Sequence, residues 1–331
     1  MTLPRIAIPL GDPAGIGPEV ALKAALDPEV RSMCRPFLFG DRSVLEAHAR
    51  ACGLAPAIQV AASVKDANVR EEGATLVVRE QFRGEELRLG EVAAAHGRSA
   101  IDSARAAIEA ALRGDIDAVV AAPHTERAIQ LAGVPFDGYP SFVARCAGIP
   151  PEDVFLMLCF EHGGLEMRIV HTTLHVSLRR ALDLITVERV RRAIRATDSA
   201  LRRIGIRAPR IAVAGVNPHA SERGLFGDEE TRVIEPAVVD ARLEDVTVEG
   251  PFGADSLWHR SGYDAFIVMY HDQGHIAAKA LAPHRAAALT IGTPVLFSSV
   301  AHGSALDIAG KNQADPSAMI AAIRRVAERH V

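Results

Sequence analysis

Three apolar stretches of the sequence end on a histidine, and imidazole rings in such positions could hold a metal ion. They are MRIVHTTLH, ending at His175, RIAVAGVNPH, ending at His219, and FIVMYH, ending at His271. Because parallel sheets gather ligand sites at the carboxyl ends of their strands, three such endings predict a shared crevice. Three neutral imidazoles would leave one coordination position of a divalent cation open to a substrate oxygen, as in catalytic sites.

Other polar residues near these histidines are weaker candidates. In an extended segment, His171 and His175 would lie roughly 13 Å apart, too far for one ion, so we expect His171 and His275 to lie outside the ligand set. Asp272 and Asp255 could orient the imidazoles or accept a proton, although an Asp beside a turn more often caps a helix. A histidine taken alone is more often a hydrogen-bonded core or surface residue.

The elements that must position these residues follow a βαβ rhythm. Short β-branched runs such as residues 5–10 and 210–217 alternate with Ala-rich stretches at 99–115 and 189–206. In the stretch from Ser99, apolar residues recur at helical spacing and Gly114 closes the helix. The pattern predicts an α/β protein with a largely parallel sheet.

Two glycine-rich stretches suggest a nucleotide site. GDPAGIGPEV (11–20) follows the first strand and opens a helix, which alone would indicate only a tight turn with close packing. In AHGSALDIAGKNQADPSAMI (301–320), small residues would let a flat ligand approach the backbone, and Asp307 could accept hydrogen bonds from a ribose diol. The cofactor-binding candidates are Gly11, Asp12, His302, Gly303, Ser304 and Asp307.

Composition excludes several classes of function. With 331 residues, 49% of them hydrophobic, the chain can bury a large core. A net charge of −4 does not suit a nucleic-acid partner. No apolar run resembles a signal peptide or a membrane span, so we expect a cytoplasmic protein. The four cysteines are scattered and fit core packing better than a disulfide framework.

The glycine-rich stretches carry a resemblance to a known superfamily. GDPAGIGPEV with HGSALDIAGKNQADPSAMI is similar to the paired signatures of isocitrate and isopropylmalate dehydrogenases. TTLH, NPHASE and MYHDQG resemble the metal motifs of the 4-hydroxythreonine-4-phosphate dehydrogenase (PdxA) family, and the similarity covers essentially the whole chain. It implies two α/β/α domains with a cleft between them. We expect a discontinuous nucleotide-cleft domain at 1–125 and 285–331, and a metal and dimerisation domain at 126–284.

The resemblance also implies site residues. Within this family His175, His219 and His271 would be the metal ligands, and a homodimer would complete the active site. Asp307 falls where NAD-using relatives hold the adenosine ribose, so we expect NAD. For the metal, zinc is the first choice with imidazole ligands, and nickel, cobalt or manganese would also serve.

Departures from the family pattern bear on the substrate. Where the pyridoxine enzyme has Gly-His-Thr-Glu this chain has GYPS (138–141), and where it has Pro-Ile-Asn-Lys this chain has PHTE (123–126). Ungapped counting places the family's phosphate-binding Arg on Phe297 and its Asn on Ala288, while its substrate Lys is kept as Lys279. Losing a bidentate Arg contact removes roughly 1.5 to 3 kcal/mol from phosphate binding. We expect a flatter pocket, shaped by Tyr139, Ser141 and Phe297.

GYPS, NPHASE, LFG, HDQGH and SSVAHGSALDIAG are instead similar to the family's aromatic-degradation branch, typified by terephthalate dihydrodiol dehydrogenase. The resemblance implies NAD-dependent oxidation of a secondary alcohol β to a carboxylate, followed by loss of carbon dioxide, on a cis-dihydrodiol carboxylate. Lys279 would bind substrate and relay a proton, and Asp255 is a second candidate base.

Three alternatives stay open. One is 4-hydroxythreonine-4-phosphate dehydrogenation, or the oxidation of a related phosphorylated hydroxy acid. Another is acyl transfer to phosphate, for which three metal-type histidines would be superfluous. The last is a non-catalytic binder of metal or nucleotide.

Overall fold

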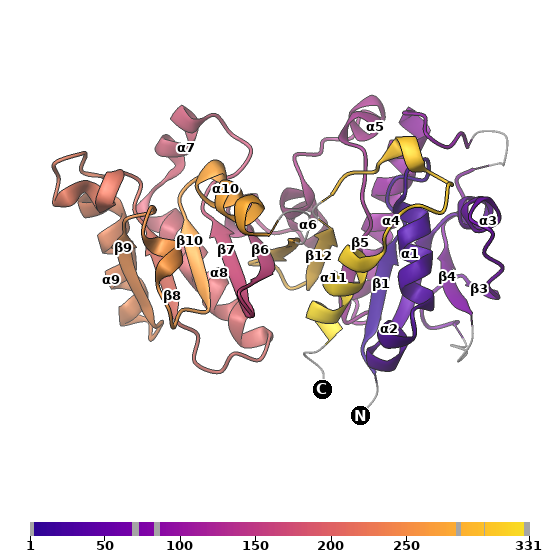
Figure 1. Cartoon of the computed structure of the whole chain (residues 1–331), viewed down its shortest axis with the longest axis horizontal. Coiled ribbons are helices and arrows are strands. Elements are labelled where there is room, and N and C mark those ends of the chain that lie inside the picture. Colours follow the sequence, from indigo (N-terminus) through magenta and orange to yellow (C-terminus); the bar gives the residue numbers. More distant parts are fainter. Residues whose placement is uncertain (1–2, 68–72, 83–86, 283–285, 301, 328–331) are drawn as a thin grey trace. The chain divides into compact units, whose positions relative to one another are not determined.

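The computed structural model describes residues 3–67, 73–82, 87–282, 286–300 and 302–327, and these form two compact units. Unit 1 comprises residues 1–147 and 294–331, and unit 2 comprises residues 148–293. In each unit, helices surround the strands of a sheet (Figure 1). Each unit also has a hydrophobic core of its own.

The sheet of unit 1 is built from parallel strands in the order β3-β4-β2-β1-β5-β12. Strands buried on both faces need helices on both faces, which is why β1, β5 and the later part of β2 read as apolar runs, whereas the edge strand β3 includes Gln59 and an exposed Val60. The strands are β1 (Arg5–Pro9), β2 (Arg35–Gly40), β3 (Ile58–Ala61), β4 (Ala74–Val78), β5 (Ala118–Ala121) and β12 (Phe297–Val300).

Helix α4 (Ala94–Leu112) covers one face of this sheet. Its Ile101 and Ile108 share a core with Phe37 and Phe39 of β2. Because side chains alternate along a strand, the buried Leu38 between them faces the opposite side. The other helices of unit 1 are α1 (Gly17–Leu26), α2 (Pro28–Met33), α3 (Arg42–Ala51), α5 (Glu126–Leu131), α6 (Tyr139–Ala147) and α11 (Ser317–Ala327), with a short 3-10 turn, η5 (Leu306–Ile308).

The sheet of unit 2 mixes parallel and antiparallel strands in the order β11-β6-β7-β10-β8-β9. Strands β7 (Leu165–His171), β10 (Ala265–Val268), β8 (Ile211–Ala214) and β9 (Val248–Phe252) are parallel, whereas β6 (Phe155–His162) runs antiparallel to β7 and to β11 (Ala287–Ile291). The β6–β7 hairpin turns at Gly163 and Gly164, whose positive φ angles of 60° and 77° suit a tight hairpin. The βαβ rhythm of the sequence did not predict these antiparallel strands.

Unit 2 is completed by the helices α7 (Leu178–Leu184), α8 (Val187–Arg203), α9 (Glu235–Leu243) and α10 (His271–Leu281). Short helical turns are η1 (Pro151–Asp153), η2 (Pro218–Glu222), η3 (Glu230–Ile234) and η4 (Leu257–His259). Helix α8 begins where the Thr186 hydroxyl accepts a hydrogen bond from the Arg189 amide, two residues before the predicted start.

The units divide at other positions than the sequence suggested. The expected boundaries were 125/126 and 284/285, whereas the compact units divide at 147/148 and 293/294. Helices α5 and α6 belong to unit 1 because Ile129 and Phe142 pack into the core beneath α4. Gly97 of α4 lets α5 approach so closely that a Cβ would lie 2.1 Å from the Ala128 carbonyl oxygen.

Two expectations drawn from composition concern thiols and membranes. All four cysteines are free, and Cys34, Cys52 and Cys159 are buried, as core packing requires. Burial raises the pKa of the Cys34 thiol to about 12. Among the helices of the described residues, none has both the length and the apolar character needed to cross a membrane.

Candidate functional site

The three predicted metal ligands follow neighbouring strands of unit 2. Strands β7, β10 and β8 lie side by side and run parallel, so the loops after them meet at one edge of the sheet. His175 follows β7, His219 lies in η2 after β8, and His271 is the first residue of α10 after β10. This edge is where the sequence predicted a crevice.

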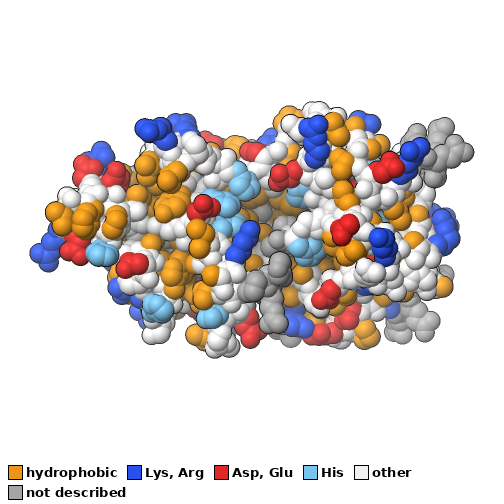
Figure 2. All heavy atoms as spheres, turned by 45° about the horizontal axis from the view of Figure 1, so that its top comes forward, with side chains coloured by type: hydrophobic (Ala, Val, Ile, Leu, Met, Phe, Trp, Pro, Cys, Tyr) orange, Lys and Arg blue, Asp and Glu red, His pale blue; other side chains and the backbone are white. Residues whose placement is uncertain are grey.

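Four histidines form a cluster, which we call the imidazole cluster: His171 at the end of β7, His175 in the loop after it, and His271 and His275 in α10. The ring of His271 stacks on that of His275 at 3.8 Å between centroids and lies 5.5 Å from that of His175. The ring of His171 lies 4.5 Å from that of His275. Figure 2 shows pale blue histidine side chains grouped at the surface. Two imidazoles that share one zinc ion have centroids about 5 Å apart, so His175 and His271 are suitably spaced.

His171 occupies a place that the sequence did not predict. The chain bends at residues 172 and 173 instead of continuing extended, so the 13 Å separation assumed between His171 and His175 does not apply. His171 is almost fully buried, and neither ring nitrogen has a partner at hydrogen-bonding geometry, although the Leu156 backbone lies near enough to affect its pKa. Gly274 of α10 packs directly on this ring, because a Cβ there would lie 2.5 Å from Nε2 of His171.

Two rings of the cluster, those of His171 and His275, are held in the neutral form by their surroundings. Burial, and then the charge that His275 would carry, hold the pKa of His171 well below its ordinary value. Burial and the neighbouring His271 lower the pKa of His275 to about 4. Neutral His171 and His275 add no positive charge beside the predicted ligands His175 and His271, so they would not repel a divalent cation there.

Carboxylates orient two of the predicted ligands. Nδ1 of His271 lies 2.7 Å from Oδ1 of Asp272, and Nδ1 of His219 lies 3.2 Å from Oε1 of Glu222. A carboxylate on Nδ1 fixes the tautomer and leaves Nε2 as the nitrogen for a metal, an arrangement found in metal sites. Both pairs therefore fit a bound cation. Glu222 was not singled out from the sequence.

His219 itself lies apart from the imidazole cluster in the contacts seen. Its ring packs against Phe226 at 6.3 Å, and within the described residues no three His, Cys, Asp or Glu side chains are arranged to hold an ion. Residues 219–223 all have left-handed φ angles, between 49° and 70°, although none is glycine. Such strained backbone is characteristic of functional segments. The three-histidine site stays a prediction.

Two side chains that sequence reasoning missed anchor the loops of this site. Gln273 accepts a hydrogen bond from the Met269 amide at 2.7 Å and donates to the Gly215 carbonyl at 2.9 Å, which ties the β10 loop to the β8 loop. The buried carboxylate of Glu230 accepts from the amides of Val216 and Asn217, each at 2.7 Å. Apart from the bond to Met269, these contacts join residues 13 to 58 positions apart, so the local pattern does not mark them.

The two predicted proton-transfer residues are both exposed. Lys279 lies in the last turn of α10, the helix that carries the stacked histidines. Asp255 lies after β9, in the loop whose Gly253 packs on the backbone of His219, with a Cβ position 3.2 Å from its Cα. Both side chains therefore belong to unit 2, and their catalytic roles stay predictions.

In unit 1, the predicted cofactor residues gather where the loops after β1, β5 and β12 meet. After β1, the next strands are added on one flank of β1, in the order β2, β4 and β3. The strands β5 and β12 are added on its other flank. The winding direction therefore changes between β1 and β5, and their carboxyl ends form a topological switch point. The Asp12 amide donates to the Pro123 carbonyl at 2.9 Å, and the Ile16 amide to the Ser304 carbonyl at 2.8 Å. Backbone hydrogen bonds thus join the three loops.

The six cofactor candidates divide into two groups. Gly11, Asp12 and Ser304 are buried, and Oδ1 of Asp12 accepts from the Ala14 amide at 2.9 Å, so these residues shape the loops. A Cβ on Gly11 would lie 2.2 Å from the Pro123 carbonyl oxygen. His302, Gly303 and Asp307 are partly or fully accessible, and they are the members able to touch a ligand directly.

The three residues expected to shape a substrate pocket also lie in unit 1. Phe297 is fully buried in β12 and packs on the ring of Tyr139 at 4.7 Å, while Ser141 is half-buried in the first turn of α6. Tyr139 is itself largely buried, and this burial raises the pKa of its phenol. Its ring contacts those of Phe136 and His124, so an aromatic cluster stands beside the switch point.

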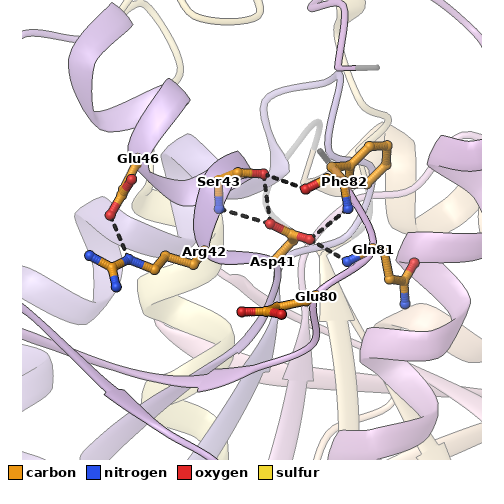
Figure 3. Close-up of a pocket in the computed structure, with 7 residues that line it drawn as sticks. All are labelled: Asp41, Arg42, Ser43, Glu46, Glu80, Gln81 and Phe82. Carbon is orange, nitrogen blue, oxygen red and sulfur yellow. Dashed lines mark hydrogen bonds and ion pairs between the residues drawn. The ribbon is translucent and has the colours of Figure 1, made fainter. Parts of the chain in front are cut away.

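A separate pocket of about 570 Å³ lies at the start of α3 (Figure 3). Asp41 caps this helix, accepting hydrogen bonds from Ser43 at 2.8 Å, from Phe82 at 2.8 Å and from the Gln81 amide. Burial raises the pKa of Asp41, but these hydrogen bonds outweigh burial and lower it. None of the predicted site residues lines this pocket, and its central carboxylate already has partners.

Comparison with known proteins defines the class to which this molecule belongs. The family model described as "Pyridoxal phosphate biosynthetic protein PdxA" matches residues 32–326. A 1,2-dihydroxy-3,5-cyclohexadiene-1,4-dicarboxylate dehydrogenase from Comamonas sp is 42% identical over 321 residues, 96% of each chain. A protein from Symbiobacterium thermophilum, provisionally named D-threonate 4-phosphate dehydrogenase, is 41% identical over 98% of this chain and 96% of its own.

Solved structures agree with this assignment. The 4-hydroxythreonine-4-phosphate dehydrogenase from Klebsiella pneumoniae has a TM-score of 0.86 and 34% identity, covering 98% of this chain and 99% of its own. A beta-decarboxylating dehydrogenase from Thermococcus kodakarensis, with a TM-score of 0.51 and 18% identity over 98% of this chain and 82% of its own, shows the fold alone. The expected isocitrate dehydrogenase-like α/β fold is confirmed.

The chain belongs to the PdxA family, and it is a dehydrogenase, an oxidoreductase. Both the family assignment and the enzyme class had been expected from the motifs.

Proposed function

We propose that this enzyme oxidises the secondary alcohol of a cis-dihydrodiol carboxylate with NAD, and that the oxidised product loses carbon dioxide to give a catechol acid. The aromatic cluster of Tyr139, Phe136, His124 and Phe297 is the observation that carries this choice of substrate. A phosphate dianion needs charge-assisted donors, whereas rings in edge-to-face contact suit a flat hydrocarbon ring. The relative named for a cyclohexadiene diol dicarboxylate supports the same choice.

The metal would be held in unit 2. His175 and His271, whose rings are 5.5 Å apart, would bind one divalent ion together with His219, and zinc suits such a ligand set. When bound, the ion supplies Lewis acidity to a substrate oxygen. Asp272 holds Nδ1 of His271 and so keeps Nε2 of that ring available. Glu222 does the same for His219.

The cofactor would be held in unit 1, at the switch point. Gly303 has open space around it, so a flat group can approach its backbone, and the exposed Asp307 can accept hydrogen bonds from a ribose diol. When bound, NAD accepts the hydride of the alcohol carbon. Gly11, Asp12 and Ser304 fix the loops that carry these contacts.

The reaction needs a proton to leave the hydroxyl as the hydride departs. The exposed Lys279 is our candidate for binding the substrate and relaying this proton, and Asp255 is a second candidate. Loss of carbon dioxide from the resulting β-keto acid leaves an electron pair that becomes part of an enol. In a cyclohexadiene ring that enol completes an aromatic system, which supplies driving force.

We also propose that the enzyme is a cytoplasmic homodimer. Unit 2 exposes several large apolar side chains that a second copy could cover, on and before α7 and in the turn after η2: Val176, Leu178, Leu182, Leu225 and Phe226. Its cysteines are free, as in a reducing compartment. Sedimentation equilibrium would reveal the dimer, and a monomer at micromolar concentration would contradict it.

Steady-state assays with a substrate panel test the proposed function. We expect NADH formation and carbon dioxide release from a cis-dihydrodiol carboxylate, abolished by chelation and restored by a divalent metal, with NAD preferred over NADP. Efficient turnover of phosphorylated hydroxy acids, with none of a dihydrodiol carboxylate, would overturn the choice of substrate. Tight binding of metal and NAD without turnover of any panel member would favour a non-catalytic binder, and acyl transfer from acyl phosphate would favour the acyltransferase alternative.

The second candidate is a dehydrogenase of a phosphorylated hydroxy acid. Relatives provisionally named for D-threonate 4-phosphate reach 41% identity, one percentage point below the dihydrodiol relative, so this alternative has equal support from similarity. The likeness to the solved 4-hydroxythreonine-4-phosphate dehydrogenase supports it too. The aromatic cluster is the reason that we place it second.

A further inference from the structure

His124, the polar member of the aromatic cluster beside Tyr139 and Phe136, occupies a central position in unit 1. It follows β5 by three residues, and β5 lies between β1 and β12 in the sheet. Ligands of open α/β sheets bind outside the carboxyl ends of the strands where the winding direction changes. In this unit that point lies between β1 and β5, so the His124 loop forms one wall of it.

The backbone on both sides of His124 is held firmly. The Pro123 carbonyl accepts from the Asp12 amide at 2.9 Å, and the Ala122 amide donates to the Pro9 carbonyl at 3.1 Å. On the other side, the Thr125 hydroxyl donates to the Ser304 hydroxyl at 2.8 Å. The loop is therefore fixed to the two neighbouring loops, and the direction of the His124 side chain is fixed with it.

Aromatic side chains hold the ring itself. Its centroid lies 4.9 Å from that of Phe136 and 4.8 Å from that of Tyr139, both in edge-to-face geometry. The residue is half-buried, and within the described part of the chain its ring nitrogens make no hydrogen bond. A ring that is oriented by its neighbours but has free polar atoms is suited to contact a ligand.

The protonation state of the ring follows from its surroundings. Burial lowers the pKa of His124, and the carboxylates of Glu126 and Asp12 oppose this shift without cancelling it. At neutral pH the imidazole is therefore uncharged. It has one donor and one acceptor nitrogen, which matches a hydroxyl group better than it matches a phosphate dianion.

We propose that His124 is a substrate-contacting residue that hydrogen-bonds a hydroxyl group of a flat ring lying beside Phe136, a partly exposed member of the aromatic cluster. The class of substrate rests on the proposed function, whereas the contact itself does not. His124 thereby selects uncharged, ring-borne hydroxyls over phosphorylated open-chain acids. Unlike Tyr139 and Phe297, which are largely buried, His124 is partly exposed and has polar ring atoms.

Two substitutions test this contact in the metal-loaded enzyme. His124→Leu removes both nitrogens and should raise KM for a cis-dihydrodiol carboxylate about tenfold, with kcat and KM for NAD changed by less than about threefold. His124→Gln keeps a donor and an acceptor and should recover most of that loss. His162→Leu, at an exposed histidine at the end of β6, is the matched control and should leave KM unchanged. Isothermal titration with a dihydroxybenzoate gives a second readout, in which His124→Leu should weaken binding similarly.

Each outcome bears on one proposal. An unchanged KM in His124→Leu, on whichever substrate the wild type turns over, overturns the inference. Equal losses in both variants, together with a lowered melting temperature, also overturn it, because they indicate a purely structural role. If the wild type turns over only phosphorylated acids, the proposed function is wrong. A raised KM of His124→Leu for those acids would then still support contact between His124 and substrate, but would overturn its selectivity for ring hydroxyls.

Discussion

The two loop clusters of this molecule are built in different ways. In unit 1, the loops after β1, β5 and β12 are joined by backbone hydrogen bonds, such as Asp12 to Pro123 and Ile16 to Ser304. In unit 2, side chains do most of this work, since Gln273 and Glu230 tie down the loops after β10 and β8. The groups offered to a ligand differ as well. Unit 1 offers open backbone and aromatic rings, and unit 2 offers imidazoles.

This difference indicates how each cluster would respond to change. A site defined by backbone geometry tolerates most side-chain substitutions but not added bulk at a glycine. A site defined by imidazoles depends on the identity and protonation of a few rings. Unit 2 should therefore be sensitive to histidine substitution and to acid, and unit 1 to a Cβ in its loops.

The largest effect is expected from removing one imidazole. His271→Ala deletes the ring that stacks on His275 and lies 5.5 Å from that of His175. We expect loss of bound metal and a fall in kcat/KM on the order of 1000-fold, because a Lewis acid contributes several kcal/mol to the transition state. Metal content of dialysed protein and initial rates measure the two effects. Unaltered metal content would show that the cation is held elsewhere, and His259→Ala, at an exposed histidine of η4, is the control.

Acid provides the next test of the comparison. The pKa of His275 is lowered to about 4 in the folded protein by burial and by His271, whereas an unfolded histidine titrates near 6.5. Below pH 6.5 the unfolded state therefore binds the proton more readily, so stability is greatest above that pH and falls as pH decreases toward 4. His171, whose pKa burial also holds well below the ordinary value, adds to this loss.

We expect chelated protein to lose on the order of a few kcal/mol of unfolding free energy between pH 7 and pH 4 through these histidines. Carboxylates contribute to acid sensitivity as well, so the informative quantity is the difference between wild type and His275→Gln. Urea denaturation at several pH values should show a shallower pH dependence in the variant. Equal slopes in both proteins would mean that His275 titrates normally.

Sequence reasoning reached the elements more readily than the contacts between them. Local periodicity predicted the strands β10 and β8 and the helix that contains Ile101 and Ile108. Short motifs, which are also local, predicted the family. The bend after His171 was missed because an apolar run ending in TTLH reads equally well as an extended strand. The Gly163-Gly164 pair was an available hairpin signal that went unused.

The contacts that hold the loops of the candidate site depend on long-range packing, so the sequence did not predict them. Glu230 and Gln273 look like ordinary polar helix residues until the β8 loop is placed against them. His124 had been noted only as a departure from the family's phosphate contacts, and its contacts with Tyr139 and Phe136 appear only when β5 and α6 are assembled. Asp12, predicted to contact the cofactor, is buried, and its Oδ1 accepts a hydrogen bond from the Ala14 amide. In a sequence, a carboxylate that bonds a nearby amide cannot be distinguished from one that binds a ligand.

The smallest effects should come from two glycines that differ mainly in what lies against them. Neither has a positive φ, so an added methyl group tests packing alone. In Gly15→Ala, the new Cβ would lie 2.6 Å from the Ser304 Cβ and 2.7 Å from its carbonyl oxygen. In Gly274→Ala, it would lie 2.5 Å from Nε2 of the buried His171. Overpacking of this kind costs about 1 to 3 kcal/mol.

The two variants differ in what offsets this cost. Gly274 is inside helix α10, where alanine is favoured over glycine by about 1 kcal/mol, whereas Gly15 precedes α1 and gains nothing comparable. A side chain such as His171 can also shift more readily than the hydrogen-bonded backbone of Ser304. We therefore expect Gly15→Ala to lose about 2 kcal/mol and Gly274→Ala about 1 kcal/mol, measured by urea denaturation, with Ala280→Ser on the exposed side of α10 as a control. If Gly274→Ala proved the more damaging change, the imidazole cluster of unit 2 would be more rigid than the backbone-bonded loops of unit 1.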